Sequence, residues 1–197
     1  MRILKNIFCS ILILFFLINN SWSKSASEFI NSLSTEASNI LSSKLSDDEK
    51  IIKLKELGEQ SVDIKRVSFY TLGKHRKTLT DSQKKQYEEL FKEYFLKKFS
   101  GTLVVYTDAK IAVLSEEIKN EKYTIVNSKL IGTSERPEVK IDWRIYTKDP
   151  ENPLVLDLTI EGVSLARAQK EEFNSIIANN DGNIEALFEN LNKFLEN

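Results

Sequence analysis

Two segments in the C-terminal half of the chain alternate apolar and polar residues with a period of two. Apolar side chains fall at the odd positions of residues 139–146 and at the even positions of residues 154–161. This alternation predicts two strands of a sheet with one packed and one wetter face, in a tightly constrained register. The packed face is expected to carry Val139, Ile141, Trp143, Ile145, Leu154, Leu156, Leu158 and Ile160, and the wetter face Lys140, Asp142, Arg144, Tyr146, Val155, Asp157, Thr159 and Glu161.

Charge indicates how these two strands pair. An antiparallel register that sets Trp143 opposite Leu158 also sets Arg144 opposite Asp157. Apolar side chains then face apolar side chains, and opposite charges face each other, which stabilises a sheet. We therefore predict a structural ion pair between Arg144 and Asp157. A catalytic or binding role for the polar strand face is the alternative interpretation.

The first half of the chain carries helical patterns. Residues 28–42 have apolar positions at helical spacing, and capping-box patterns begin at Ser46 and Thr80. Asp63 is placed to cap a short helix that Gly73 ends. The helix after Thr80 has an aromatic-rich stripe, which is usually core and less often the wall of a ligand site. Its members are Tyr87, Leu90, Phe91, Tyr94, Phe95 and Phe99.

The second half changes to strands and then returns to helices. Residues 111–114 predict a short strand, and residues 122–131 predict a longer one before the two alternating segments. A helix that contains Phe173 follows them, and a terminal amphipathic helix covers residues 184–195. We therefore expect an α+β domain with N-terminal helices, about four mainly antiparallel strands and a C-terminal helix pair.

The N-terminal segment has the features of a signal peptide. Arg2 and Lys5 precede an apolar run at 7–18, and small residues flank Trp22 before an expected cut after Ser23. A retained membrane anchor is the alternative, and no later run is long enough to span a bilayer. We therefore expect a signal peptide at residues 1–23 and a single domain at residues 24–197.

Removal of this segment changes the chemistry available to the chain. It takes away Cys9, the only cysteine, and it moves the formal net charge from −1 to −3. The weak acidity argues against a nucleic-acid partner or a general anionic-membrane surface. His75 is the only histidine, and the sequence has no Gly-x-Ser-x-Gly motif. We predict no catalytic residue, no metal site and no cofactor.

Several motifs resemble the MlaC-type phospholipid-binding proteins, also called the toluene-tolerance or auxiliary transport family. The most specific match is Asp157–Leu165 followed by Glu172 and Phe173. The sequence departs from the family pattern at His75 and Arg76, where two aromatic residues are usual, and at Pro153–Leu154, where Trp-Lys is usual. The other matching positions are Leu72, Gly73, Leu79, Thr80, Gln83, Phe91, Tyr94, Phe95, Gly101, Leu103, Tyr106 and Asp142–Ile145.

The resemblance implies a periplasmic phospholipid carrier without enzymatic activity. Such a protein shuttles lipid between an outer-membrane lipoprotein complex and an inner-membrane ABC transporter, and so maintains outer-membrane lipid asymmetry. The implied fold is a nuclear-transport-factor-like curved sheet wrapped by helices, with acyl chains held between them. The expected lipid-binding residues are Phe69, Leu72, Phe91, Tyr94, Phe95, Ile141, Trp143, Leu156, Leu158 and Val163.

The sequence leaves two other functions open. One is a nuclear-transport-factor-like enzyme that uses Asp142 or Asp157 with Tyr146 on a small apolar substrate. The other is a periplasmic chaperone or adaptor with an apolar groove for proteins. We expect a monomer, because the sheet and helices use the apolar faces that the sequence offers.

Overall fold

The structure is a computed structural model that describes residues 25–107, 109–134 and 137–197. The predicted signal peptide therefore lies outside the described residues. The α+β class is confirmed, with a sheet of five strands where about four were expected. The helices are α2 (Ala26–Ser42), α3 (Asp47–Ser61), α4 (Ile64–Thr71), the 3-10 helix η1 (Gly73–Lys77), α5 (Asp81–Leu103), α6 (Leu165–Ala178) and α7 (Glu185–Glu196). The strands are β1 (Ile111–Asn120), β2 (Tyr123–Leu130), β3 (Val139–Tyr146), β4 (Leu154–Ile160) and β5 (Val163–Ser164).

The predicted capping boxes start two of the helices. At the start of α3, Ser46 Oγ accepts from the Glu49 backbone N–H at 3.3 Å, and the Glu49 carboxylate accepts from the Ser46 N–H at 2.9 Å. The hydrogen bonds that the Ser46 backbone N–H and hydroxyl donate to the Glu49 carboxylate lower the pKa of Glu49. Thr80 and Gln83 make the same reciprocal pair at the start of α5. Local side-chain bonds thus set both helix starts, as the sequence pattern indicates.

The sheet is antiparallel throughout, in the order β1-β2-β3-β4-β5. Trp143 lies opposite Leu158 and Arg144 opposite Asp157, so the proposed register is confirmed there. Beyond Arg144 a bulge shifts the pairing, and Ile145 faces Val155. The extra residue turns Val155 onto the packed face, where it is only 4% exposed. Its assignment to the wetter face was therefore wrong.

The first strand is longer than the sequence predicted. β1 runs over Ile111–Asn120 and pairs with β2 along its length, although residues 115–120 are mostly polar and exposed. Their strand conformation comes from the hydrogen-bonding partner β2, because they have no apolar alternation of their own. The apolar pattern of the sequence therefore predicts a strand only at residues 111–114.

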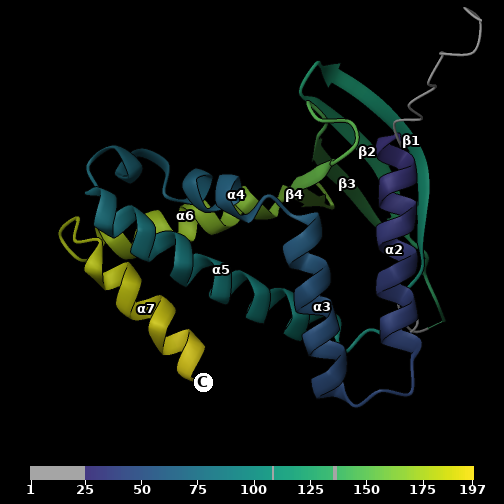
Figure 1. Ribbon diagram of the computed structural model, residues 1–197, viewed down its shortest axis with the longest axis horizontal. Coiled ribbons are helices and arrows are strands. Elements are labelled where there is room, and N and C mark those ends of the chain that lie inside the picture. Colours follow the sequence, from purple (N-terminus) through teal and green to yellow (C-terminus); the bar gives the residue numbers. More distant parts are fainter. Residues whose placement is uncertain (1–24, 108, 135–136) are drawn as a thin grey trace, which may run out of the picture.

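Two apolar clusters form the interior. The sheet cluster packs α2 against one face of the sheet, and the helical cluster lies among α4, α5, α6 and α7. Figure 1 shows α2 lying along the sheet at one end of the molecule, α5 and α7 side by side at the other, and α3 between them. Among the described residues, no helix has the length and apolar character needed to cross a membrane.

Candidate functional site

The helical cluster contains most of the aromatic residues predicted to contact lipid. Phe91 is 2% exposed and meets Phe173 edge-on, with their ring centroids 6.3 Å apart. Leu72 is fully buried in the same cluster, and Phe69 packs against its edge, partly exposed. Tyr87, which was assigned to the helix stripe, also lies at its centre. Of the stripe, Tyr87, Phe91 and Tyr94 thus lie in the core, whereas Leu90, Phe95 and Phe99 are partly buried.

A buried hydrogen bond crosses this cluster. The hydroxyl groups of Thr71 and Tyr87 lie 2.7 Å apart, and both residues are fully buried. Thr71 Oγ1 also donates to the Ser68 carbonyl oxygen at 2.7 Å, so its one hydrogen is used and Tyr87 is the donor of the pair. Burial raises the pKa of Tyr87, because the phenolate form would lose its hydration. The pair ties α4 to α5.

The ring and the hydroxyl group of Tyr94 lie in different environments. Its ring packs between Phe173 and Phe194, but its hydroxyl donates to the Gln169 side chain at 2.8 Å. Lys98 donates to the same hydroxyl at 2.8 Å. The polar end of Tyr94 therefore links α5 to α6 and lies in a polar network. Tyrosine typically packs its ring among apolar side chains while its hydroxyl bonds to polar groups.

A row of stacked rings continues along α5 toward α3. The rings of Phe91 and Phe95 are 6.3 Å apart and nearly parallel, and those of Phe95 and Phe99 are 5.7 Å apart. Phe95 is partly buried at the edge of the helical cluster. Gly58 on α3 lets Phe99 approach, because a Cβ there would lie 3.1 Å from two atoms of the Phe99 ring. This row gives α5 an apolar edge that faces α3.

The sheet cluster contains Ile141 and Trp143, each 9% exposed. The Trp143 indole N–H donates to Ser128 Oγ at 2.8 Å, and Ser128 Oγ donates to the Ile141 carbonyl oxygen at 2.9 Å. Ala26 and Ile30 of α2 belong to the same cluster. The apolar face of the hairpin is thus covered by α2.

None of the predicted residues on and after β4 is fully buried. Leu158 packs at the edge of the sheet cluster, partly buried, and Leu156 is half-buried beside the bulge. Val163 in β5 is 58% exposed. Apart from Leu156 and Val163, the predicted lining residues therefore belong to or pack against one of the two clusters, and Val163 lies at the surface.

The two clusters meet at the segment that joins α3 to α4. Val62 packs against both clusters. The backbone N–H of Asp63 donates to the Val155 carbonyl oxygen at 3.0 Å, on the strand that carries the bulge. No pattern in the sequence indicates this junction, since Val62 lies between two helices and takes part in neither periodic pattern.

The predicted ion pair between Arg144 and Asp157 is not formed within the described part of the chain, although the residues face each other. Asp157 accepts from Ser164 Oγ at 2.5 Å and from the backbone N–H of Ala166 at 2.9 Å, at the start of α6. The Arg144 guanidinium lies 4.7 Å from the centre of the Tyr123 ring. Asp157 therefore anchors α6 to the sheet, because its carboxylate satisfies donors at a helix N-terminus.

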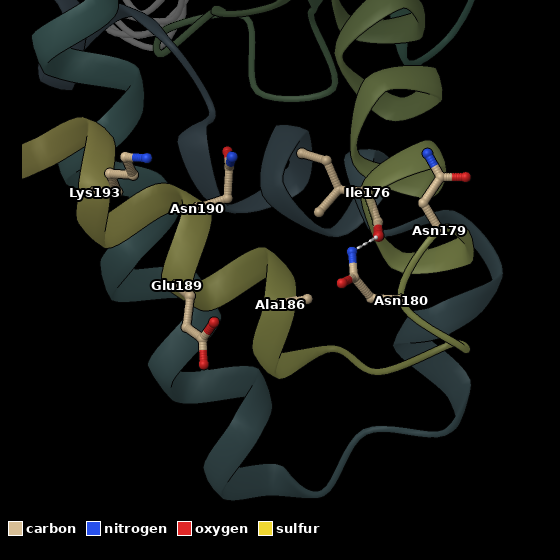
Figure 2. Close-up of a pocket in the computed structure, with 7 residues that line it drawn as sticks. All are labelled: Ile176, Asn179, Asn180, Ala186, Glu189, Asn190 and Lys193. Atoms are coloured by element: carbon tan, nitrogen blue, oxygen red, sulfur yellow. Dashed lines mark hydrogen bonds between the residues drawn. The ribbon is translucent and has the colours of Figure 1, made fainter.

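Two of the pockets among the described residues open at the surface, and none of the predicted lipid-binding residues lines either of them. The larger, of about 390 Å³, lies between α6 and α7. Figure 2 shows it lined mainly by polar side chains, with Asn180 Nδ2 donating to the Ile176 carbonyl oxygen at 2.8 Å. The smaller lies between α2 and α3. The space for acyl chains that is expected between the sheet and the helices is thus not one of these two pockets.

The described residues offer little for acid–base or metal chemistry. Within them, no group of histidine, cysteine and acidic side chains is arranged to hold a metal ion. His75 lies on η1, where partial burial and the charge of Lys74 lower its pKa. Arg66 covers the ring of Tyr146, 3.8 Å from its centre. Asp157 and Tyr146, two of the three residues weighed for catalysis, thus make structural contacts.

Comparison with known proteins gives one family and one fold relative. The sequence profile of the MlaC protein family matches residues 31–193. A phospholipid-binding protein from Ralstonia solanacearum, solved in complex with a phospholipid, matches with a TM-score of 0.73 and 19% identity. The match covers 88% of this chain and 98% of that one, so the two share a fold. No curated protein matches this sequence.

Proposed function

Because the chain belongs to the MlaC family, we propose that it binds phospholipid and carries it between membranes. In this proposal the carrier moves through the periplasm between an outer-membrane lipoprotein complex and an inner-membrane ABC transporter. The transfer would support outer-membrane lipid asymmetry. The family match over residues 31–193 carries the proposal, and the fold relative that was solved with a phospholipid supports it.

We place the acyl chains between the two apolar clusters, next to Val62. Partly buried apolar side chains pack against each cluster, with Phe69 and Phe95 on the helical cluster and Leu158 on the sheet cluster. Each acyl CH₂ removed from water contributes about 0.8 kcal/mol. Two long chains therefore contribute roughly 20 kcal/mol before ordering costs, enough to offset separation of part of this packing.

Release of the lipid requires the reverse change. A binding partner that favours the closed packing, or that offers its own apolar path, shifts the population toward the empty carrier. The hydrogen bond from Asp63 to Val155 lies at the junction and would limit how far the helices move from β4. Residues 24–197 act in this proposal as one lipid-binding domain.

Lipid extraction and mass spectrometry of the purified protein test the proposal. The full chain, expressed in a Gram-negative host and recovered from the periplasm, should begin at Lys24 and contain phospholipid near one molecule per chain. Bound peptide segments without lipid would favour an adaptor instead. An empty protein with a turnover that Asp157→Asn abolishes would favour an enzyme.

A matched pair of substitutions tests where the lipid lies. Phe95→Ser and Leu158→Ser, the junction variants, each remove a partly buried apolar side chain that packs against one of the two clusters, and each should lower the retained lipid several-fold. Ile52→Ser, at a side chain that is 57% exposed on α3, should leave lipid retention unchanged. Circular dichroism must show that all three variants are folded. Equal lipid content in folded junction and control variants would refute the placement.

A further inference from the structure

Positive charge is concentrated in one short part of this weakly acidic chain. Residues 64–85 contain seven lysine or arginine residues and a single acidic residue, Asp81, although the formal net charge of the whole chain is −1. The segment covers α4, η1 and the start of α5. In Figure 1, η1 lies at the end of the helical layer, next to the start of α5 and away from the sheet.

Part of this charge is neutralised within the protein. Lys65 pairs with Glu88 at 3.2 Å, Arg66 pairs with Asp63 at 2.5 Å, and Lys84 pairs with Asp81 at 3.0 Å. The lysine and arginine residues of η1 differ. Lys74, Arg76 and Lys77 are exposed, and none takes part in an ion pair with another described residue.

The backbone presents these cations in a fixed arrangement. Leu72 and Leu79, 0% and 7% exposed, anchor the two ends of the segment in the helical cluster. Between them, the His75 N–H donates to the Leu72 carbonyl oxygen at 3.1 Å, and Gly73 has a φ of +56° that favours glycine. Side chains three residues apart in a 3-10 helix project to the same side. Lys74 and Lys77 therefore form one cationic edge.

The cationic surface continues onto α4 and α6. Tyr70 is 41% exposed, and the Lys170 ammonium lies 5.2 Å from the centre of its ring. A Cβ on Gly73 would lie 2.8 Å from the Lys170 side chain, so the lysine reaches to η1 as well. An exposed aromatic ring among lysine and arginine residues is suited to the polar boundary of a bilayer. We call Tyr70, Lys74, Arg76, Lys77 and Lys170 the basic tip.

We propose that the basic tip docks the protein reversibly onto a bilayer surface that contains anionic phospholipid. The choice of a lipid surface over an acidic protein rests on the proposed carrier function. Since the chain as a whole is slightly acidic, attraction is confined to this end, and binding is weak, oriented and sensitive to salt. No apolar segment needs to insert, so the carrier can leave again.

Vesicle sedimentation at low salt tests this proposal. The full mature chain should bind vesicles of equal phosphatidylglycerol and phosphatidylcholine, but not vesicles of phosphatidylcholine alone. Each cation near such a surface contributes about fivefold in partitioning, so the triple variant Lys74→Ser, Arg76→Ser, Lys77→Ser should bind roughly a hundredfold more weakly. Raising the salt concentration should release the unmodified protein.

A control with the same charge change separates the tip from net charge. Lys44→Ser, Lys122→Ser, Lys148→Ser removes exposed lysines elsewhere and should bind nearly as the parent protein does. Equal weakening in both triple variants, or no binding of the parent protein, would overturn the proposal. Binding to polyglutamate but not to vesicles would also overturn it and indicate an acidic protein. Both triple variants should retain bound lipid. A loss of bound lipid would therefore test the carrier function and not the docking of the basic tip.

Discussion

Ser128 binds the indole of Trp143. Trp143 is the only tryptophan that remains once the predicted signal peptide, which contains Trp22, is removed. In the sheet cluster the Trp143 N–H donates to Ser128 Oγ at 2.8 Å, and that hydroxyl in turn donates to the Ile141 carbonyl oxygen. Ser128 is fully buried. Ser128→Ala therefore removes the indole's partner at a position that water does not reach.

The expected cost follows from this geometry. A buried donor left without an acceptor costs about 1 to 3 kcal/mol, and the lost bond to the Ile141 carbonyl oxygen falls within the same range. We expect Ser128→Ala to lower the free energy of unfolding by about 2 to 3 kcal/mol. For a domain of this size, that corresponds to a fall in Tm of roughly 4 to 12 °C.

Urea unfolding followed by Trp143 fluorescence measures the effect directly. Ser115→Ala is the matched control, since Ser115 lies in the neighbouring strand and accepts an exposed hydrogen bond from Asn127 at 3.1 Å. It should change stability by less than about 0.5 kcal/mol. Equal stabilities for Ser128→Ala and the parent protein would show that Trp143 is not held as described.

Three further outcomes follow from the helical side of the molecule. Tyr87→Phe should lower the free energy of unfolding by about 1 kcal/mol, and Thr71→Val should lower it by about 1 to 3 kcal/mol, because only Thr71→Val leaves a buried hydroxyl, that of Tyr87, without a partner. Thermal unfolding should rank the two variants in this order. Burial raises the pKa of Tyr87, so stability should fall with pH above about 10, where only the unfolded chain loses the proton; a denaturation midpoint that stays constant between pH 9 and pH 11 would contradict this. Gly58→Val should destabilise the contact between α3 and Phe99 by about 1 to 3 kcal/mol, whereas Gly58→Ala should be closer to neutral, since its gain in helix propensity offsets a tight contact; equal urea midpoints for the two variants would be the contrary result.

Local features were determined by the sequence itself. Ser46 and Thr80 each bond to a residue three positions later, so both helix starts follow from neighbours in the chain. The alternation of β3 is likewise local, and Ile141, Trp143 and Ile145 are buried as predicted. The alternation and charges of two strands were enough to predict Trp143 opposite Leu158, although the ion pair used in that prediction is not formed.

Long-range packing was decided only by the tertiary structure. The bulge after Arg144 turns Val155 inward, and β2 draws mostly polar residues into β1. Asp157 binds Ser164 and Ala166 in place of Arg144. These outcomes depend on which backbone groups and side chains compete for the same partner, and that competition exists only after distant segments have met. Periodicity identifies the apolar face of an element, but not the element that covers it.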